Sequence, residues 1–134
     1  MTGKAQLKGQ KGFSLLELMI AMFIMIILLS VALPTYHKTV QHARETVLKE
    51  NLWQMRKAID QYAADKAKYP KSIDDLVESK YLRERPIDPM LDDKTEWNEI
   101  MGQDPNSPEA EEGLTDVKST SEDTDDDGKK YSDY

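Results

Sequence analysis

The chain has 134 residues, enough for one small domain beside a membrane anchor. Its formal net charge is −7, and residues 109–134 alone hold ten acidic residues and three lysines, so the acidity belongs to the C-terminal end and argues against nucleic-acid binding. There is no cysteine in the chain, which excludes a disulfide.

The first twelve residues are basic and end in a glycine. They contain no acidic residue, and their charges are Lys4, Lys8 and Lys11. Lysines in front of an apolar segment favour the cytoplasmic side of a membrane. We therefore expect residues 1–12 to lie in the cytoplasm and the C-terminal part of the chain to lie on the opposite side of the membrane.

An apolar stretch of 21 residues follows, from Phe13 to Leu33, in which only Ser14, Glu17 and Ser30 are polar. As a helix it would measure roughly 30 Å, the thickness of a bilayer core. A charge in such a segment costs on the order of 3 kcal/mol at mid-membrane, so Glu17 is a functional candidate.

Two ordinary membrane segments are alternatives. A secretory signal peptide has a shorter apolar region followed by small residues at its cleavage site, and Leu33-Pro34-Thr35-Tyr36 is a poor site of that kind. A single-pass anchor explains the length and the lysines but not the position of Glu17.

The junction Lys11-Gly12-Phe13, with Glu17 and Pro34 downstream, resembles the class III signal peptide of type IV pilins and type II secretion pseudopilins. The resemblance implies that a prepilin peptidase cuts after Gly12 and methylates Phe13. Glu17 would then be the fifth mature residue, and Pro34 would occupy mature position 22, where the family often has proline.

Residues 35–67 continue the helix as an amphipathic segment. Apolar residues recur at steps of three and four, namely Val40, Ala43, Val47, Leu48, Leu52, Met55, Ile59 and Tyr62. Pro34 predicts a kink or a loosened turn, or else the start of a new helix. Trp53 lies off the centre of the apolar stripe, and its two alternative roles are contact with a neighbouring subunit and packing in the core.

After Pro70 the pattern predicts a two-turn helix that begins at Ser72, followed by an extended turn at Pro86-Ile87-Asp88-Pro89. This order resembles the major pseudopilin of type II secretion more than a type IV pilin. The family often has Trp-Gly after this Asp-Pro, where the present chain has Met90-Leu91.

Two short strands are predicted, at Thr95–Ile100 and Gly113–Lys118, with an acidic, proline-rich loop between them. We expect an antiparallel sheet of two or three strands against the long helix. Tyr131 and Tyr134 are expected to fasten the chain end to this sheet.

One metal site is a candidate. Asp123, Asp125, Asp127 and Gly128 match the start of an EF-hand loop, and alternate carboxylates on a tight turn suit calcium. Tyr134 stands where the loop needs glutamate, so a true EF-hand is not expected. The family resemblance implies calcium in this region with Asp116 as a further ligand, whereas a solvated acidic segment is the alternative.

No set of side chains for nucleophilic catalysis is visible, so we expect no enzyme. His37 and His42 are five residues apart and do not share a helix face, which disfavours a metal pair.

The predicted fold is therefore α+β and type IV pilin-like, with a long N-terminal helix on a small antiparallel sheet. Its predicted parts are a removable leader (1–12), a transmembrane and filament-core helix (13–34), the amphipathic continuation (35–67) and a small periplasmic region (68–134).

The resemblance implies a single-pass protein of the bacterial inner membrane that polymerises into a periplasmic filament for type II protein secretion. Its implied partners are further copies, other pseudopilins, the prepilin peptidase and an inner-membrane assembly platform. A type IV pilin of a surface fibre and a membrane-anchored periplasmic binding protein are the alternatives.

Overall fold

The computed structural model describes residue 3, residues 12–92 and residues 94–134. The predictions that concern Lys4, Lys8 and Lys11 lie outside these residues. The chain divides into two compact units, Met1–Thr39 and Val40–Tyr134, which we call unit 1 and unit 2.

One long helix, α1, runs from Leu15 to Lys66 and contributes to both units. Pro34 lies inside it, so the alternative that this proline begins a new helix is wrong. Hydroxyl groups on either side of Pro34 donate back to helix carbonyls: Ser30 Oγ to Ile27 at 2.6 Å and Thr35 Oγ1 to Val31 at 3.1 Å. A polar side chain in a helix without another partner commonly bonds in this way.

The core of unit 2 forms around the second half of α1. Leu48, Leu52, Met55, Ile59 and Tyr62 are buried, as their spacing predicts. Each such side chain contributes about 1.5–3 kcal/mol when it is fully removed from water. Two residues of the predicted stripe, Ala43 and Val47, are exposed, and the carboxylate of Glu45 is buried near them.

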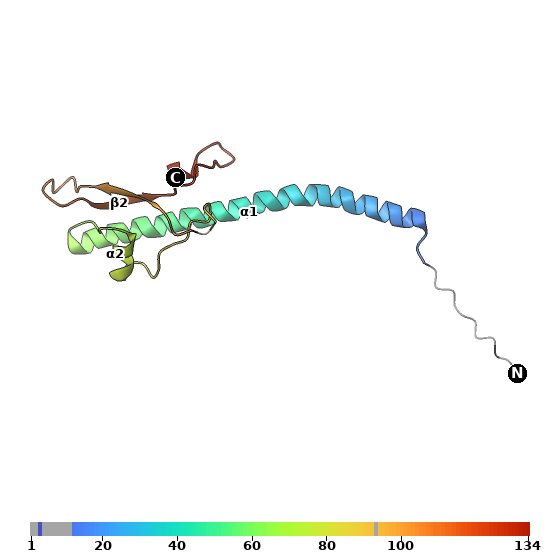
Figure 1. The fold of residues 1–134 in the computed structure, drawn as a ribbon, viewed down its shortest axis with the longest axis horizontal. Helices are drawn as coiled ribbons and strands as arrows, with labels where there is room; N and C mark the ends of the chain where they lie inside the picture. The colour runs from blue at the N-terminus through green and yellow to red at the C-terminus, as the bar shows by residue number, and fades with distance from the viewer. Residues whose placement is uncertain (1–2, 4–11, 93) are drawn as a thin grey trace. The chain divides into compact units, whose positions relative to one another are not determined.

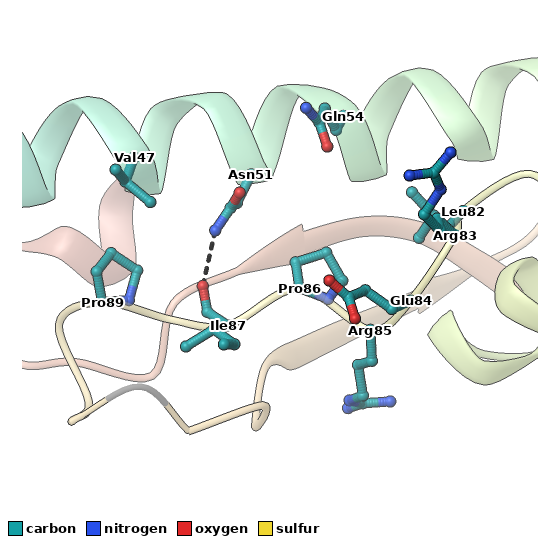
Figure 2. Close-up of a pocket in the computed structure, with 10 residues that line it drawn as sticks. All are labelled: Val47, Asn51, Gln54, Leu82, Arg83, Glu84, Arg85, Pro86, Ile87 and Pro89. Carbon is teal, nitrogen blue, oxygen red and sulfur yellow. Dashed lines mark hydrogen bonds between the residues drawn. The ribbon is translucent and has the colours of Figure 1, made fainter.

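The short helix α2 spans Ile73–Glu78 and begins as predicted: the Ser72 side chain accepts a hydrogen bond from the Asp75 amide at 3.2 Å. The chain then returns along α1 through residues 82–89, as Figure 2 shows. Asn51 Nδ2 donates to the Ile87 carbonyl at 2.7 Å and joins this extended segment to the helix.

The sheet has two antiparallel strands, β1 (Asn98–Gly102) and β2 (Gly113–Lys118), in a register that pairs Asn98 with Lys118. In Figure 1 this hairpin and the C-terminal end of the chain lie along the second half of α1. A Cβ at Gly113 would stand 2.5 Å from Tyr69 Cβ, so only glycine lets β2 approach the end of α1 this closely. The expected α+β fold is confirmed, with β2 at its predicted bounds.

The first strand begins three residues later than predicted. Trp97 is buried and its Nε1 donates to the Pro86 carbonyl at 2.9 Å, while Arg85 Nε donates to the Thr95 carbonyl at 2.6 Å. These contacts hold residues 95–97 against the 82–89 segment, so pairing with β2 starts only at Asn98.

Candidate functional site

The N-terminal end of α1 is capped locally. Ser14 precedes the helix, its Oγ accepts a hydrogen bond from the Glu17 amide at 3.2 Å, and its carbonyl accepts from the Leu18 amide at 3.1 Å. Ser14 and Glu17 thus have the spacing of a capping box, which the sequence analysis did not predict. The Glu17 carboxylate in the first helical turn also suits the positive end of the helix dipole.

The apolar half of α1 has no protein covering in the part of the chain that the structure describes. Every residue from Phe13 to Leu33 is exposed, and α1 is the one described helix that is long and apolar enough to cross a membrane. So much contiguous apolar surface is not stable in water. It needs a bilayer or other protein around it.

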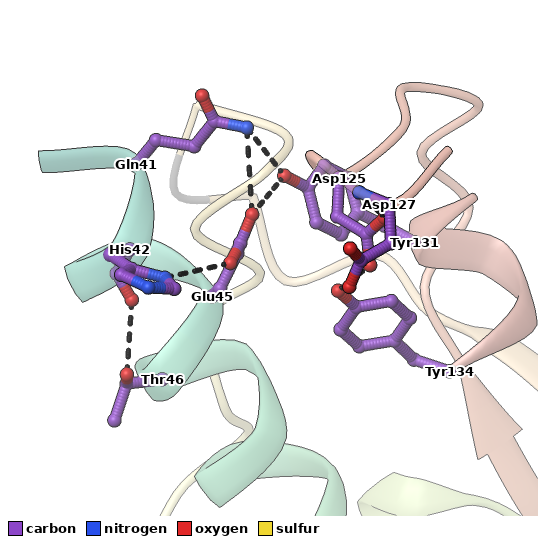
Figure 3. Close-up of polar contacts among 8 residues, drawn as sticks. All are labelled: Gln41, His42, Glu45, Thr46, Asp125, Asp127, Tyr131 and Tyr134. Carbon is purple, nitrogen blue, oxygen red and sulfur yellow. Dashed lines mark hydrogen bonds and ion pairs between the residues drawn. The ribbon is translucent and has the colours of Figure 1, made fainter. Parts of the chain in front are cut away.

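A polar cluster joins the C-terminal end of the chain to α1, as Figure 3 shows. The Tyr131 hydroxyl donates to Glu45 Oε1 at 2.8 Å, and Gln41 Nε2 donates to the Tyr131 oxygen at 3.1 Å. His42 Nδ1 lies 3.2 Å from Glu45 Oε2. Burial and the Glu45 hydrogen bond raise the pKa of Tyr131 above its ordinary value of 10.0.

Arg56 forms a second connection from α1 to this end of the chain. Its Nε donates to Asp116 Oδ1 at 2.8 Å, and its Nη2 donates to the main-chain oxygens of Val117 at 3.1 Å and of Tyr134 at 2.8 Å. One guanidinium therefore ties the helix to β2 and to residue 134, a geometry that the planar fork of arginine suits.

Asp125 organises the turn before the last residues. Its Oδ1 accepts from the amides of Asp127 at 3.0 Å and Lys129 at 2.9 Å, and its Oδ2 accepts from the Tyr134 hydroxyl at 2.5 Å. The Tyr134 hydrogen bond, with the two amides, lowers the pKa of the Asp125 carboxyl. Burial and the same hydrogen bond raise the pKa of Tyr134 far above its ordinary value.

The predicted calcium ligands are therefore used in other ways. Asp116 pairs with Arg56, and both oxygens of Asp125 accept hydrogen bonds from the chain. Within the described residues no group of three or more carboxylate or imidazole side chains is placed to hold a metal. This arrangement does not present Asp116, Asp123, Asp125 and Asp127 as one ligand set, and calcium binding stays a prediction.

The two C-terminal tyrosines lie in a segment that contacts β2, as predicted, and Tyr131 also bonds to the helix. Tyr131 opens a short 3-10 helix, η1 (Tyr131–Asp133), and its hydroxyl reaches Glu45 of α1. Tyr134 bonds to Asp125, and the edge of one ring meets the other at a centroid distance of 5.3 Å.

Three polar residues escaped the sequence analysis: Glu45, Arg56 and Asp88. Asp88 is fully buried, and its carboxylate accepts from Ser119 Oγ at 2.5 Å and from the Met90 amide at 2.9 Å. The one local signal for these residues is an Asx turn at Asp88. Its carboxylate accepts from the amide two residues later, that of Met90, as aspartate does in such turns.

Residues 7–33 match the family model described as the prokaryotic N-terminal methylation motif. The match covers the glycine–phenylalanine junction, Glu17 and the apolar part of α1, and it supports a pilin-like or pseudopilin-like protein. No curated protein and no solved structure matches the chain.

Proposed function

We propose that this chain is a membrane-stored subunit of a periplasmic pseudopilus that drives protein export in type II secretion. The observation that carries the proposal is the methylation motif at residues 7–33, which coincides with the exposed apolar part of α1. A subunit of this kind keeps its apolar helix in the bilayer and later exchanges lipid for the helices of other copies. Its role is structural, not enzymatic.

Specific residues would carry this role. A prepilin peptidase would cut the Gly12–Phe13 bond and methylate the new amino group of Phe13. Glu17 would remain in the first turn of the filament-core helix, four residues from that amino group. Pro34 would mark the region where the apolar part of α1 gives way to its polar part.

The choice of secretion over a surface fibre rests on the composition and order of the C-terminal region. The chain has no cysteine, so it cannot close that region with the disulfide that type IV pilins commonly use. A short helix followed by Pro86-Ile87-Asp88-Pro89 also resembles the major pseudopilin. A type IV pilin is the second candidate, because the methylation motif fits both kinds of filament.

A membrane-anchored periplasmic binding protein is the candidate from another class. It would need no cleavage at Gly12 and no helix exchange between copies. In the described residues no group of three or more carboxylate or imidazole side chains is placed to hold a metal in the grooves of unit 2.

Processing of the leader tests the proposal directly. The mature protein, extracted from membranes, should begin at Phe13 and carry one added methyl group on its amino terminus. Intact-mass measurement decides this, with a Gly12→Ala variant as the uncleaved control. A mature protein that begins at Met1, or beyond Leu33, would contradict the pilin-like assignment.

A further inference from the structure

A groove of about 510 Å³ runs between the second half of α1 and the last residues of unit 2. We call it the Trp53 groove, because the indole of Trp53 forms part of its wall. Trp53 is 55% exposed, although its helix neighbours Leu52 and Met55 are buried. A large exposed aromatic ring beside a groove is the kind of side chain that anchors protein interfaces.

Two lysines, Lys49 and Lys129, line this groove together with Asp125 and Asp127. These lysines and Lys57 lie over aromatic rings. Lys57 Nζ is 4.8 Å from the centre of the Trp53 ring, and Lys49 and Lys129 are 5.4 Å and 5.1 Å from the centre of the Tyr134 ring. Across the described residues none of these three ammonium groups lies within ion-pair distance of a carboxylate. Lys49, Lys57 and Lys129 therefore have aromatic partners but no ion pair among the residues that the structure describes, although Asp125 and Asp127 reduce the positive charge of the groove itself.

The loop between β1 and β2, residues 103–112, has the opposite character. It carries no cation, and its acidic residues are Asp104, Glu109, Glu111 and Glu112. Nearly all of it is exposed, and Pro105 and Pro108 stand at its tip. Within the described chain its carboxylates form no ion pair either. The acidic residues of this loop are thus complementary in charge to Lys49, Lys57 and Lys129 at the Trp53 groove.

The loop lies away from the groove of its own chain. The Leu114 amide donates to the Pro70 carbonyl at 2.7 Å, so the loop leaves the sheet beyond the end of α1. Trp53 lies thirteen residues before Lys66, the last residue of that helix, which is about 20 Å along its axis. Figure 1 shows the loop at the end of unit 2 where α1 ends, and the C-terminal end of the chain farther back along the helix.

We propose that the Trp53 groove of one copy receives residues 103–112 of a neighbouring copy. Prolines of the loop would pack on the Trp53 ring, and its glutamates would pair with Lys49, Lys57 and Lys129. The two surfaces are different, with the groove midway along the unit 2 part of α1 and the loop beyond its end, so the contact is head-to-tail and can repeat without closing, as a filament requires. This inference rests on the proposed filament function and identifies surfaces of unit 2 that would join successive subunits.

A charge swap tests the contact in the full chain, expressed with its assembly machinery. Reversing the groove (Lys49→Glu with Lys57→Glu) and reversing the loop (Glu109→Lys with Glu111→Lys) should each lower filament yield about tenfold, because like charges then face each other. Combining the four substitutions should bring the yield back to within about twofold of the original. Lys68→Glu with Lys80→Glu, exposed lysines away from the groove, should leave the yield unchanged.

A cross-linking experiment gives a second readout, and the absence of native cysteine makes it clean. A chain with both Lys57→Cys and Glu111→Cys should form a ladder of disulfide-linked dimers, trimers and longer species on oxidation. A chain with only one of these cysteines has one thiol and cannot extend beyond a dimer. A ladder from the double-cysteine chain, with no dimer from either single-cysteine chain, therefore reports a head-to-tail contact between these two surfaces.

The outcomes separate this inference from the proposed function. Filaments of the unsubstituted protein test the function, whereas the charge swap and the ladder test the contact. Filaments that form normally from both reversed variants, or a double-cysteine filament that yields no species beyond the dimer, would overturn the loop-in-groove contact while leaving the filament function in place.

Discussion

At the scale of single residues, two polar side chains of α1 determine how the end of the chain is held. Glu45 accepts the Tyr131 hydroxyl, and Arg56 bonds to Asp116 and to two main-chain oxygens. Both belong to a helix whose apolar pattern says nothing about them. Each side chain stabilises the folded state, because its partner gives up hydrogen bonds to water on folding and needs a replacement for them.

Replacing Arg56 tests the second of these connections. Arg56→Met keeps the apolar stem but removes all three hydrogen bonds, and we expect a loss of roughly 1–2 kcal/mol in the free energy of unfolding, since the side chain is 37% exposed and partly screened by water. Urea denaturation of residues 35–134 measures this loss. Arg56→Lys should recover only part of it, because an ammonium cannot span the same oxygens. Equal stability of Arg56→Met and the original would show that the connection is not needed.

The tyrosine pKa shifts predict a loss of stability in alkali. Because the pKa values of Tyr131 and Tyr134 are raised in the folded state above 10.0, the folded chain holds these protons more tightly than the unfolded chain. Their contribution is complete below about pH 10 and falls as the pH rises further. Urea denaturation of residues 35–134 at neutral pH and at about pH 11 should show this fall.

Phenylalanine variants are the matched controls for this pH dependence. Tyr134→Phe and Tyr131→Phe each lack one ionising hydroxyl, so each should reduce the slope of stability against pH above about pH 10. Tyr131→Phe should also cost about 1 kcal/mol at neutral pH, because Glu45 then loses a donor. An unchanged slope in both variants would assign the alkaline loss to other groups.

At the scale of elements, α1 is one continuous helix with an apolar first part and an amphipathic second part. Polar side chains attach the segment 119–134 to the second part. The segment is joined to the 82–89 turn by Ser119 and Asp88, and to α1 by Tyr131 and Arg56. Its acidic turn is shaped by Asp125, which accepts two amides and the Tyr134 hydroxyl. Calcium would have to compete with these hydrogen bonds.

The calcium prediction is tested on this segment. Binding through Asp123, Asp125 and Asp127 would raise the melting temperature of residues 35–134 in calcium relative to chelator, since the ion would bind the folded state alone. Tyr134→Phe should enlarge the difference, because it frees Asp125 Oδ2, and Asp125→Ala should abolish it. Identical melting curves in calcium and in chelator would instead support a solvated acidic segment.

At the scale of the whole molecule, the chain combines an exposed apolar helix segment with a small folded unit whose core is complete. Among the described residues unit 2 buries thirteen apolar side chains in one cluster, and none of them belongs to the apolar segment of unit 1. The apolar segment is then available for lipid or for other copies.

Glu17 tests assembly. Its carboxylate and the amino group of Phe13 would both be costly to bury alone, so pairing between neighbouring subunits would set the register of otherwise similar apolar helices. Glu17→Val should still be cleaved after Gly12 and still insert into the membrane, but filament yield on overexpression should fall about tenfold or more.

Glu17→Gln separates this role from helix capping. Glutamine also fits the third position of a capping box that begins at Ser14, yet it carries no charge. We expect Glu17→Gln to assemble as poorly as Glu17→Val. Normal filaments from cleaved Glu17→Gln would show that the residue caps the helix and does not set the register.

The sequence by itself determined the features that depend on neighbours along the chain. The length of α1 follows from its periodicity and from Pro70, the start of α2 from Ser72, and the bounds of β2 from Gly113 and the following residues. Each of these signals lies within a few residues of what it predicts, so no knowledge of distant partners is needed.

Only the tertiary structure decided which polar residues are buried and which apolar residues are not. Arg56 meets Asp116 sixty positions away, and Glu45 meets Tyr131 eighty-six positions away. The same packing covers Trp97 and leaves Trp53 exposed, and it moves the start of β1 from Thr95 to Asn98. Hydrogen-bond partners and solvent exposure depend on which distant segments fold back on a residue, and its neighbours in sequence do not specify these.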